Sequence, residues 1–434
     1  MITKTSAVRM IRAAILVAVA APFAAHADDD HGRRHWNDSS VSVGQRPLYL
    51  VDGMEESWLK HRLMECRSGP FRRTDFSIGH RGAALQFPEH TKESYVAAAR
   101  QGAGIVECDV TFTRDGALVC RHAQNDLHTT TNILQTPLAS NCVKPFSAAV
   151  IDANGNVITP ASAECRTSEL TLPEFRSLRG KMDASNPAAR TVAQYLGGTA
   201  SWRTDLYTGR GTLMTFRDSI ELNRKLGVKH TPELKGGTEA EIKQVFGSQK
   251  NYALKFTDEL RSAGVKPREV WPQSFNVEDV LVWIDSTEYG KQAVYLLDYN
   301  ADTNDIVIQP PYDQMNRAKY FQMLKQRGVR IVAPPMPALL AVDANDNVVP
   351  SQLAMDMKAM GFDIITWTFE RSDLRGGASK AGYYYDFDPQ GRAIRTDSDM
   401  YKALDVLARN VKVLGIFSDW PATVTYYANC MGLK

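Results

Sequence analysis

Eight short apolar segments recur along this chain, and segments with helical periodicity separate them. The apolar segments lie at residues 76–80, 104–113, 228–235, 268–275, 293–299, 328–336, 361–369 and 413–421. Between the first two, "TKESYVAAARQGA" begins with a threonine able to cap a helix and repeats its apolar side chains at helical spacing. Eight alternating units predict a (β/α)₈ TIM barrel rather than an open doubly wound sheet. No GxGxxG follows the first segment, which also disfavours a dinucleotide site.

One interval is too long for this repeat. About 100 residues separate His122 from the third predicted barrel strand at 228–235. We therefore predict an insertion at about 125–215, between the second and third barrel strands, at the catalytic end of the barrel. Such an insertion is able to cap the site and set substrate choice. A loop that only stabilises the barrel is the alternative, and the sequence leaves both open.

The N-terminus has the pattern of a secretory signal peptide over residues 1–27. Three basic residues precede an apolar run over 13–25, which closes on the small-x-small sequence Ala25-His26-Ala27. That run is shorter than the ~20 apolar residues of a membrane span. We expect cleavage after Ala27, a periplasmic or secreted protein, and no stable membrane insertion.

The remaining chain divides into two parts. Residues 28–70 are polar and predict a partly flexible N-terminal extension, and residues 71–434 form the barrel domain. The net charge of +2 and the scattered basic residues give no reason to expect nucleic-acid binding. The oligomeric state is left open.

Export makes disulfides possible, and the chain has six cysteines: Cys66, Cys108, Cys120, Cys142, Cys165 and Cys430. Six cysteines allow fifteen complete pairings. Cys142 and Cys165 bracket a polar, turn-rich loop, and we favour that pair. Cys108 and Cys120 lie in two apolar segments close in sequence, so a disulfide and two small core residues are both open.

Two acidic residues share one face of the second predicted strand. Side chains alternate along a strand, so Glu107 and Asp109 project together, and Cys108 projects from the other face. Glu233, in the next barrel strand, adds a third carboxylate. Acids gathered on one face repel unless a cation lies between them, and oxygen ligands favour calcium or magnesium over zinc. The three acids therefore predict one divalent cation, Ca²⁺ or Mg²⁺.

Two histidines and two cations flank the acids. His80 ends the first barrel strand, and His122 ends the short strand after the second. Histidines serve as general acid and base near neutral pH. Arg81 offers a forked donor for phosphate oxygens, and Lys235 shares the strand face of Glu233. Together with a metal, these groups favour an anionic transition state at phosphorus.

The same segment resembles the signature of the glycerophosphodiester phosphodiesterase family. The matching elements are "HRG" at 80–82, "PEHT" at 88–91, "ECDV" at 107–110, "TRDG" at 113–116 and "RH" at 121–122. Later stretches such as "ELK" at 233–235, "PQSF" at 272–275, "ITWTF" at 365–369 and "GIFSDWP" at 415–421 are also similar. The resemblance covers roughly residues 76 to 422.

This resemblance implies a function and a role for each matched residue. It implies metal-dependent hydrolysis of glycerophosphodiesters to glycerol 3-phosphate and an alcohol. Metal ligation is implied for Glu107, Asp109 and Glu233, and acid/base catalysis for His80 and His122. Phosphate binding is implied for Arg81 and Lys235, and Trp367 is implied to line the substrate pocket.

Three positions depart from the family pattern. His90 stands where the family has asparagine, Ala123 follows the second histidine where aspartate is common, and Ser418 replaces a threonine before Asp419. None of them removes a predicted catalytic group. A pocket-shaping role and a solvated or helix-capping role for His90 are both open.

Two other functions are compatible with the same motifs. A phospholipase D-like phosphodiesterase acting on lysophospholipids would need an apolar groove, and Trp202, Tyr207 and residues 381–387 are candidates to line one. A protein that binds phosphodiesters without turnover is the second alternative. The complete set of histidines and acids argues against it.

Overall fold

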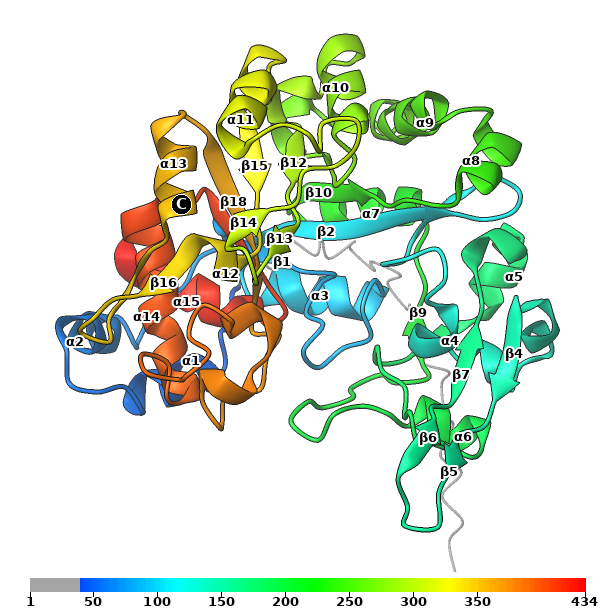
Figure 1. The fold of residues 1–434 in the computed structure, drawn as a ribbon, viewed down its shortest axis with the longest axis horizontal. Coiled ribbons are helices and arrows are strands. Elements are labelled where there is room, and N and C mark those ends of the chain that lie inside the picture. The colour runs from blue at the N-terminus through cyan, green and yellow to red at the C-terminus, as the bar shows by residue number, and fades with distance from the viewer. Residues whose placement is uncertain (1–39) are drawn as a thin grey trace, which may run out of the picture. The chain divides into compact units, whose positions relative to one another are not determined.

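The computed structural model describes residues 40–434, and its central feature is a closed parallel barrel (Figure 1). The predicted signal peptide lies outside the described residues. The barrel strands are β1 (Thr74–Gly79), β2 (Ala103–Phe112), β10 (Lys229–Leu234), β11 (Gln273–Ser274), β12 (Val294–Leu296), β15 (Ile331–Ala333), β18 (Asp363–Phe369) and β19 (Gly415–Ser418). Each pairs in parallel with its neighbour, and β1 pairs with both β19 and β2, which closes the barrel. The predicted TIM barrel is confirmed.

Inside the barrel, apolar side chains fill the lower layer and polar side chains occupy the C-terminal end. Ile78, Ile105, Leu296, Ile365 and Phe417 belong to one buried cluster. Because side chains alternate along a strand, the next inward position of β2 after residue 105 is Glu107. The apolar layer therefore supports a polar layer above it, where active sites of this fold lie.

Helices surround the barrel and follow the predicted alternation. They are α3 (Lys92–Arg100), α7 (Phe216–Leu226), α8 (Glu239–Phe246), α9 (Gln249–Ser262), α10 (Val277–Ser286), α11 (Arg317–Gln326), α13 (Gln352–Ala359), α14 (Met400–Asp405) and α15 (Pro421–Met431). Thr91 caps α3 by accepting from the Ser94 amide. Thr215 opens α7 with a reciprocal capping box, and Gly227 ends that helix in the left-handed conformation (φ +66°).

Small hairpins and a one-turn helix complete the barrel domain. The hairpin strand β3 (Leu118–Cys120) returns antiparallel to β2 and carries the chain back to the C-terminal end of the barrel. Further small strands and a one-turn helix are β13 (Tyr299–Asn300), β14 (Asp305–Ile306), α12 (Met336–Leu339), β16 (Leu340–Val342) and β17 (Val348–Pro350).

The long interval between β3 and α7 folds as a separate layer with its own core, as predicted for the insertion (Figure 1). Its elements are α4 (Leu127–Thr130), β4 (Lys144–Ser147), β5 (Val150–Ile151), β6 (Val157–Thr159), β7 (Ser162–Glu164), α5 (Leu172–Ser177), β8 (Arg179–Gly180), α6 (Val192–Leu196) and β9 (Gly211–Thr212). Leu170, Phe175 and Leu178 are fully buried in its core.

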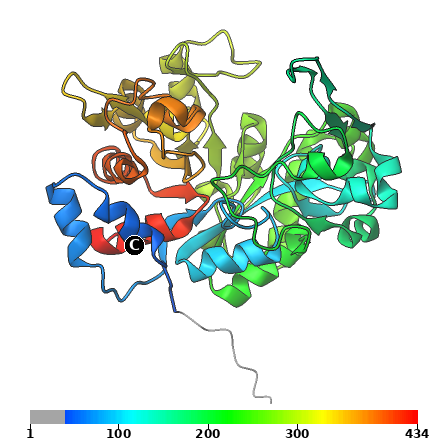
Figure 2. The same cartoon turned by 90° about the horizontal axis from the view of Figure 1, so that it is seen from below.

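The N-terminal extension contributes two helices to the barrel domain. α1 (Arg46–Asp52) and α2 (Trp58–Glu65) both contact the C-terminal helix α15, and Figure 2 shows them beside it. Arg46 forms an ion pair with buried Glu370, at the end of β18. Part of the extension predicted as partly flexible is therefore helical and attached to the barrel.

Three disulfides join all six cysteines. Cys142–Cys165 lies in the insertion, which confirms the pair that the sequence favoured. Cys108 and Cys120 also form a disulfide, which joins β2 to β3, rather than serving as two small core residues. Cys66–Cys430 ties the end of α2 to α15. Within residues 40–434, no helix has the length and apolar character needed to cross a bilayer.

Candidate active site

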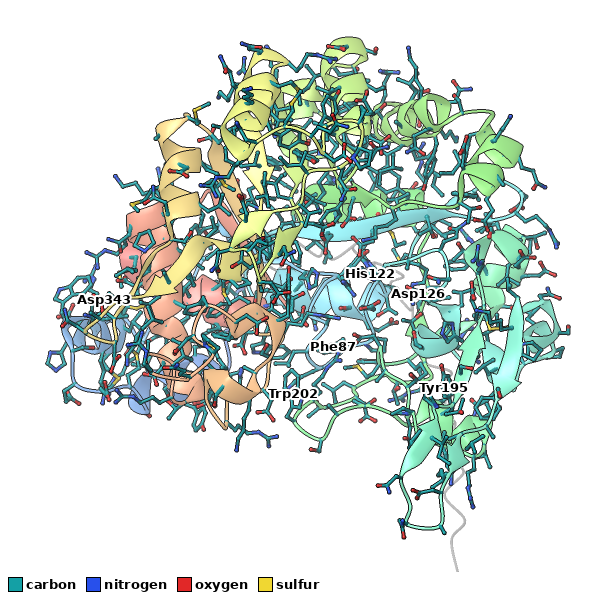
Figure 3. All side chains as sticks on the ribbon, in the orientation of Figure 1. Phe87, His122, Asp126, Tyr195, Trp202 and Asp343 are labelled. Carbon is teal, nitrogen blue, oxygen red and sulfur yellow. A yellow bond between two sulfur atoms is a disulfide. The ribbon has the colours of Figure 1, made fainter. Side chains whose placement is uncertain are left out.

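A cavity of about 550 Å³ opens at the C-terminal end of the barrel, and all eight predicted site residues line it. Side chains of the barrel domain form most of the lining, which we call the barrel wall. Residues of the insertion form the rest, which we call the insertion wall: Asp126, Thr129, Thr130, Asp183, Ala184 and Ser185. Figure 3 shows His122 of the barrel wall close to Asp126 of the insertion wall.

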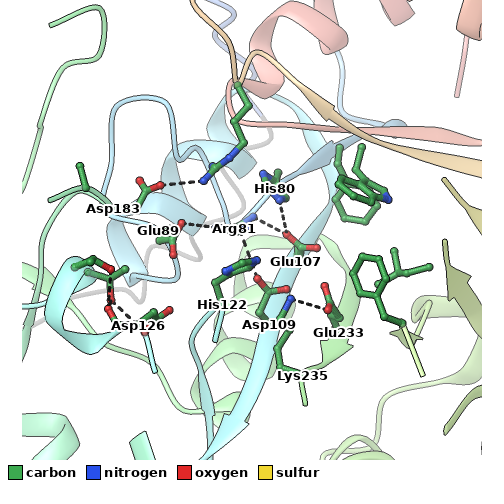
Figure 4. A pocket seen from close by; sticks show the side chains of 18 of the residues that line it. His80, Arg81, Glu89, Glu107, Asp109, His122, Asp126, Asp183, Glu233 and Lys235 are labelled. Carbon is green, nitrogen blue, oxygen red and sulfur yellow. Dashed lines mark hydrogen bonds and ion pairs between the residues drawn. The ribbon is translucent and has the colours of Figure 1, made fainter. Parts of the chain in front are cut away.

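Three buried carboxylates form the centre of the barrel wall (Figure 4). Glu107 and Asp109 project from the same face of β2, and Glu233 of β10 stands in register with Asp109. One oxygen from each residue lies within 4.8 Å of the other two. Burial and the charges of Asp109 and Glu233 raise the pKa of Glu107 well above its usual value. The three acids repel one another, and their oxygen atoms lie close enough together to fit around one cation.

The hydrogen bonds of these acids leave room for a metal ion. Glu107 accepts from the Arg81 amide (2.9 Å) and from Gln273 Nε2 (2.9 Å). Asp109 Oδ2 accepts from His90 (2.9 Å), but its Oδ1 is buried without a hydrogen-bond partner. A buried carboxylate oxygen without a donor is costly. The donor set consists of oxygen atoms, so the residues fit a hard divalent cation.

Lys235 supplies the positive charge next to this cluster. Its Nζ lies 2.7 Å from Glu233 Oε1. Burial lowers the pKa of Lys235, but Glu233 and Asp109 outweigh it and the net pKa is raised, so this ammonium stays charged. Burial raises the pKa of Glu233 to about 7, against the opposing effect of Lys235.

His80 is oriented by an ionised carboxylate. Its Nδ1 lies 2.5 Å from Asp419 Oδ1, at the end of β19. Burial opposes ionisation of Asp419, but Arg371 and His80 hold its pKa below the usual value. An ionised carboxylate only accepts hydrogen bonds, so Nδ1 carries the proton and Nε2 presents a lone pair. Burial and the charge of Arg81 lower the pKa of His80 to about 4, which keeps the ring neutral.

His122, which follows β3, also lines the cavity (Figure 4). Burial and the charges of Arg81 and Lys235 lower its pKa well below the usual value. The two histidines therefore approach the acid cluster from different strands, both in the neutral form.

Arg81 is fixed by acids rather than free in the cavity. Its Nη1 donates to Glu89 (2.8 Å), and its Nε lies 3.5 Å from Asp109. Its backbone has a positive φ of 55°, and Gly82 follows at φ +97°. A Cβ on Gly82 would lie 2.7 Å from the Ser94 backbone, so only glycine permits this turn.

His90 is part of this polar network. The ring is completely buried, donates from Nε2 to Asp109 and lies 3.1 Å from the Tyr95 hydroxyl through Nδ1. A solvated role is wrong for this residue. The "PEHT" element marks position 90 as part of the motif. The sequence does not show that the backbone adopts a φ of +55° there, and so it does not show where the ring points.

Aromatic side chains form the rest of the barrel wall. Trp367 donates its indole N–H to the Ala333 carbonyl (2.9 Å), and its ring packs edge-on against Phe275, with centroids 5.9 Å apart. Tyr384, from the segment after β18, also lines the cavity. Of the apolar residues considered for a lipid groove, Trp202 and Tyr207 do not line it.

Several lining residues were not predicted. Glu89 and Arg371 belong to the barrel wall, and Asp126 and Asp183 to the insertion wall. Glu89 lies inside a quoted motif, so its position gave a signal. The other three lie outside the motifs, and the contacts that bring them to the cavity depend on tertiary structure.

The closed βα barrel is shared with a solved structure. The putative glycerophosphoryl diester phosphodiesterase of Silicibacter pomeroyi aligns with a TM-score of 0.51 at 18% identity, over 84% of this chain and 96% of its own. At that identity the similarity establishes the fold. The class of protein is therefore a TIM barrel with a buried acidic site.

Sequence comparison identifies the family. The model of the glycerophosphoryl diester phosphodiesterase family matches residues 80–423, and this chain belongs to that family. A protein named "Extracellular protein" from Arthroderma benhamiae is 39% identical over 257 residues, which is 58% of this chain and all of the relative. Glycerophosphodiester phosphodiesterase GDPD6 of Arabidopsis thaliana is 21% identical over 402 residues, 89% of this chain and 93% of its own.

Proposed function

We propose that this protein hydrolyses glycerophosphodiesters to sn-glycerol 3-phosphate and an alcohol, with one divalent cation. One observation carries the proposal: two neutral histidines and two fixed cations share a cavity with three mutually repelling carboxylates. Family membership supports the reaction class.

We assign the cation to Glu107, Asp109 and Glu233. Their ligand atoms are all oxygen, which favours Ca²⁺ or Mg²⁺ over zinc. The ion would supply charge for a phosphate oxygen that gains negative charge in the transition state. Gln273 and the Arg81 amide hold Glu107 in place for this role.

His80 is suited to act as general base. Its Nδ1 proton is committed to Asp419, so Nε2 is free to accept a proton from the nucleophile, which is water or the neighbouring glycerol hydroxyl. The nucleophile's oxygen then forms a bond to phosphorus. The Nδ1–H to Asp419 bond stabilises the imidazolium that results.

His122 is suited to act as general acid. The bond from phosphorus to the alcohol oxygen breaks as that oxygen takes a proton from the imidazolium form of His122. The ring is neutral in the free protein, and the negative charge of the bound substrate favours the imidazolium. Arg81 and Lys235 stabilise the charge on the remaining phosphate oxygens. Trp367 and Phe275 exclude water from one side of the substrate.

The first experiment measures glycerol 3-phosphate released from glycerophosphocholine by the purified mature protein. We expect release to stop with a chelator and to return when Ca²⁺ or Mg²⁺ is added. Release that persists after complete metal removal would contradict the assignment of the acids. Binding of glycerophosphocholine without release would support the non-catalytic alternative.

A second candidate is hydrolysis of lysophospholipids, favoured by the apolar part of the barrel wall. Phe275, Leu296, Trp367, Tyr384 and Phe417 all line the cavity. Activity on micellar lysophospholipid but not on glycerophosphocholine would favour it.

We also propose that the protein acts outside the cytoplasm. Three disulfides are typical of an oxidising compartment, and the fungal relative is named an extracellular protein. Edman sequencing of the exported protein should start at Asp28.

A further inference from the structure

A chain of charged contacts runs from the insertion to the ring of His80. Asp183, in the insertion, accepts from Arg371 Nη2 (2.9 Å). Arg371 Nη1 donates to Asp419 Oδ2 (2.8 Å), and Asp419 Oδ1 accepts from His80 Nδ1 (2.5 Å). Asp183, Arg371 and His80 all line the cavity, and Figure 4 shows Asp183 and His80 on it.

The insertion holds Asp183 firmly at the start of this chain. Lys181 Nζ donates to three carbonyl oxygens, those of Thr129 (2.7 Å), Met182 (2.6 Å) and Ala184 (2.8 Å). These contacts join residues 181–184 to α4. Asp183 itself also accepts from Arg203 (2.6 Å), whose guanidinium reaches the Ala84 carbonyl after β1 (2.5 Å).

Asp419 and Arg371 each have a partner on both sides. Asp419 uses one oxygen for His80 and the other for Arg371, and Arg371 uses one Nη group for Asp419 and the other for Asp183. Without the Asp183 carboxylate, both Nη groups of Arg371 are free to turn to Asp419. A forked guanidinium then competes with His80 for the oxygen that orients its ring.

We propose that Asp183 and Arg371 are positioning residues for His80, so that the insertion completes the active site as well as covering it. This inference rests on the proposed function only in giving His80 a proton-transfer role. The contacts fix the ring orientation and the Nδ1–H tautomer whichever phosphodiester is the substrate. Partners of this kind typically change activity by about 10- to 100-fold.

Docking of the insertion alone does not need this chain. Two other ion pairs attach the insertion to the barrel helices away from the cavity: Arg166–Glu241 (3.2 Å) and Arg176–Asp218 (3.0 Å). None of these four residues lines the cavity. The Arg176–Asp218 pair therefore offers a control, an arginine–aspartate pair between the same two layers that is more exposed than Arg371–Asp183.

The test compares Asp183→Asn with Arg176→Gln as the control and Asp183→Glu as the conservative variant. We expect kcat of Asp183→Asn to fall about 10- to 100-fold, with KM changed by less than about threefold. Asp183→Glu keeps the charge and should recover part of kcat. Arg176→Gln should match the wild type. Thermal melting of all three variants separates this effect from a loss of folded protein.

A second readout does not depend on activity. The hydrogen-bonded Nδ1 proton of His80 should give a downfield resonance in ¹⁵N-histidine-labelled protein, identified by its absence in His80→Ala. We expect this resonance to shift or broaden in Asp183→Asn and to stay unchanged in Arg176→Gln. If glycerophosphocholine is not a substrate, the proposed function fails, and this resonance still tests the positioning chain.

Two results would overturn the inference. An unchanged His80 resonance in folded Asp183→Asn would show that the insertion does not orient the ring. A fall in kcat/KM that comes from a higher KM, with kcat unchanged, would assign Asp183 and Arg371 to substrate binding instead.

Discussion

The barrel wall and the insertion wall face the same cavity but are built differently. On the barrel wall, Glu107, Asp109 and Glu233 stand at alternating or register-paired positions of neighbouring strands, so the sheet sets their spacing. On the insertion wall, Asp126 and Asp183 lie in irregular segments beside α4 and β8. Their positions depend on side-chain contacts, such as those of Lys181.

This difference assigns different tasks to the two walls. A strand end inside a closed barrel is rigid, and it suits groups that must meet a metal and a phosphate with small tolerance. Loops held by a few polar contacts accept sequence change more readily, and they suit residues that read the variable part of a substrate. We therefore expect changes in the barrel wall to act on kcat and most changes in the insertion wall to act on substrate preference, with Asp183 as the exception.

The largest effect should come from the histidines of the barrel wall. We expect His80→Ala and His122→Ala each to lower kcat by about 10²- to 10⁴-fold, since general acid/base catalysis contributes that much. Exposed His61→Ala is the control and should leave kcat unchanged. Wild-type turnover in both cavity variants would contradict the assignment of the chemistry to the barrel wall.

The separate core of the insertion gives a second test. Phe175 is completely buried in that core, and Phe→Ala at such a site costs about 3–5 kcal/mol. We expect Phe175→Ala to open the insertion and lower turnover while the barrel stays folded. Hydrogen exchange should show faster exchange within residues 125–215 only. Uniform faster exchange in the barrel strands would mean that the two layers unfold as one unit.

The sequence predicted the acid cluster of the barrel wall, although not Glu89 or Arg371, because the signals for the cluster are the strand period and the strand order. The strand period places Glu107 and Asp109 on one face, and the order of strands brings Glu233 beside them. Along the chain, Asp419 lies 339 residues from His80. Arg371 lies 48 residues from Asp419, and Asp183 lies 188 residues from Arg371. Asp419 lies in a quoted motif, but no period or motif indicates its contact with His80, and Arg371 and Asp183 lie outside the motifs, so the polar chain behind His80 was not predictable.

The disulfides show the same limit. Cys142 and Cys165 are 23 residues apart around a turn-rich loop, and that pair was predicted. Cys66 and Cys430 are 364 residues apart, and their pairing requires that α2 and α15 pack together. No local pattern in the sequence indicates that packing.

A histidine outside the cavity predicts how the barrel responds to acid. Burial and the charge of Arg224 lower the pKa of His230 from 6.5 to about 4 in the folded protein. The unfolded chain binds a proton at this residue below about pH 6.5 and the folded protein does not, so stability is lost as the pH falls from about 6.5 to 4. The loss approaches roughly 3 kcal/mol.

His230→Gln should remove this contribution. We expect the difference in unfolding free energy between the variant and the wild type to change by about 2–3 kcal/mol between pH 7 and pH 4.5, in favour of the variant at low pH. Urea unfolding at both pH values measures it. A difference that stays constant with pH would show that the ring is protonated in the folded state.

The smallest predicted effect concerns Asp126 and the choice of headgroup. Burial raises its pKa to about 6, so its charge is present at pH 7.5 and mostly absent at pH 5. On the insertion wall this charge favours a cationic headgroup over a neutral one by an amount typical of a partly solvated pair, about 0.2–1 kcal/mol. We expect Asp126→Asn to lower kcat/KM for glycerophosphocholine relative to glycerophosphoglycerol by about threefold at pH 7.5.

At pH 5 the wild type should approach the preference of the variant, because protonation removes the same charge. Identical preferences at pH 7.5 would mean that the headgroup is read by the aromatic side of the barrel wall, and the division of tasks between the two walls would then be wrong.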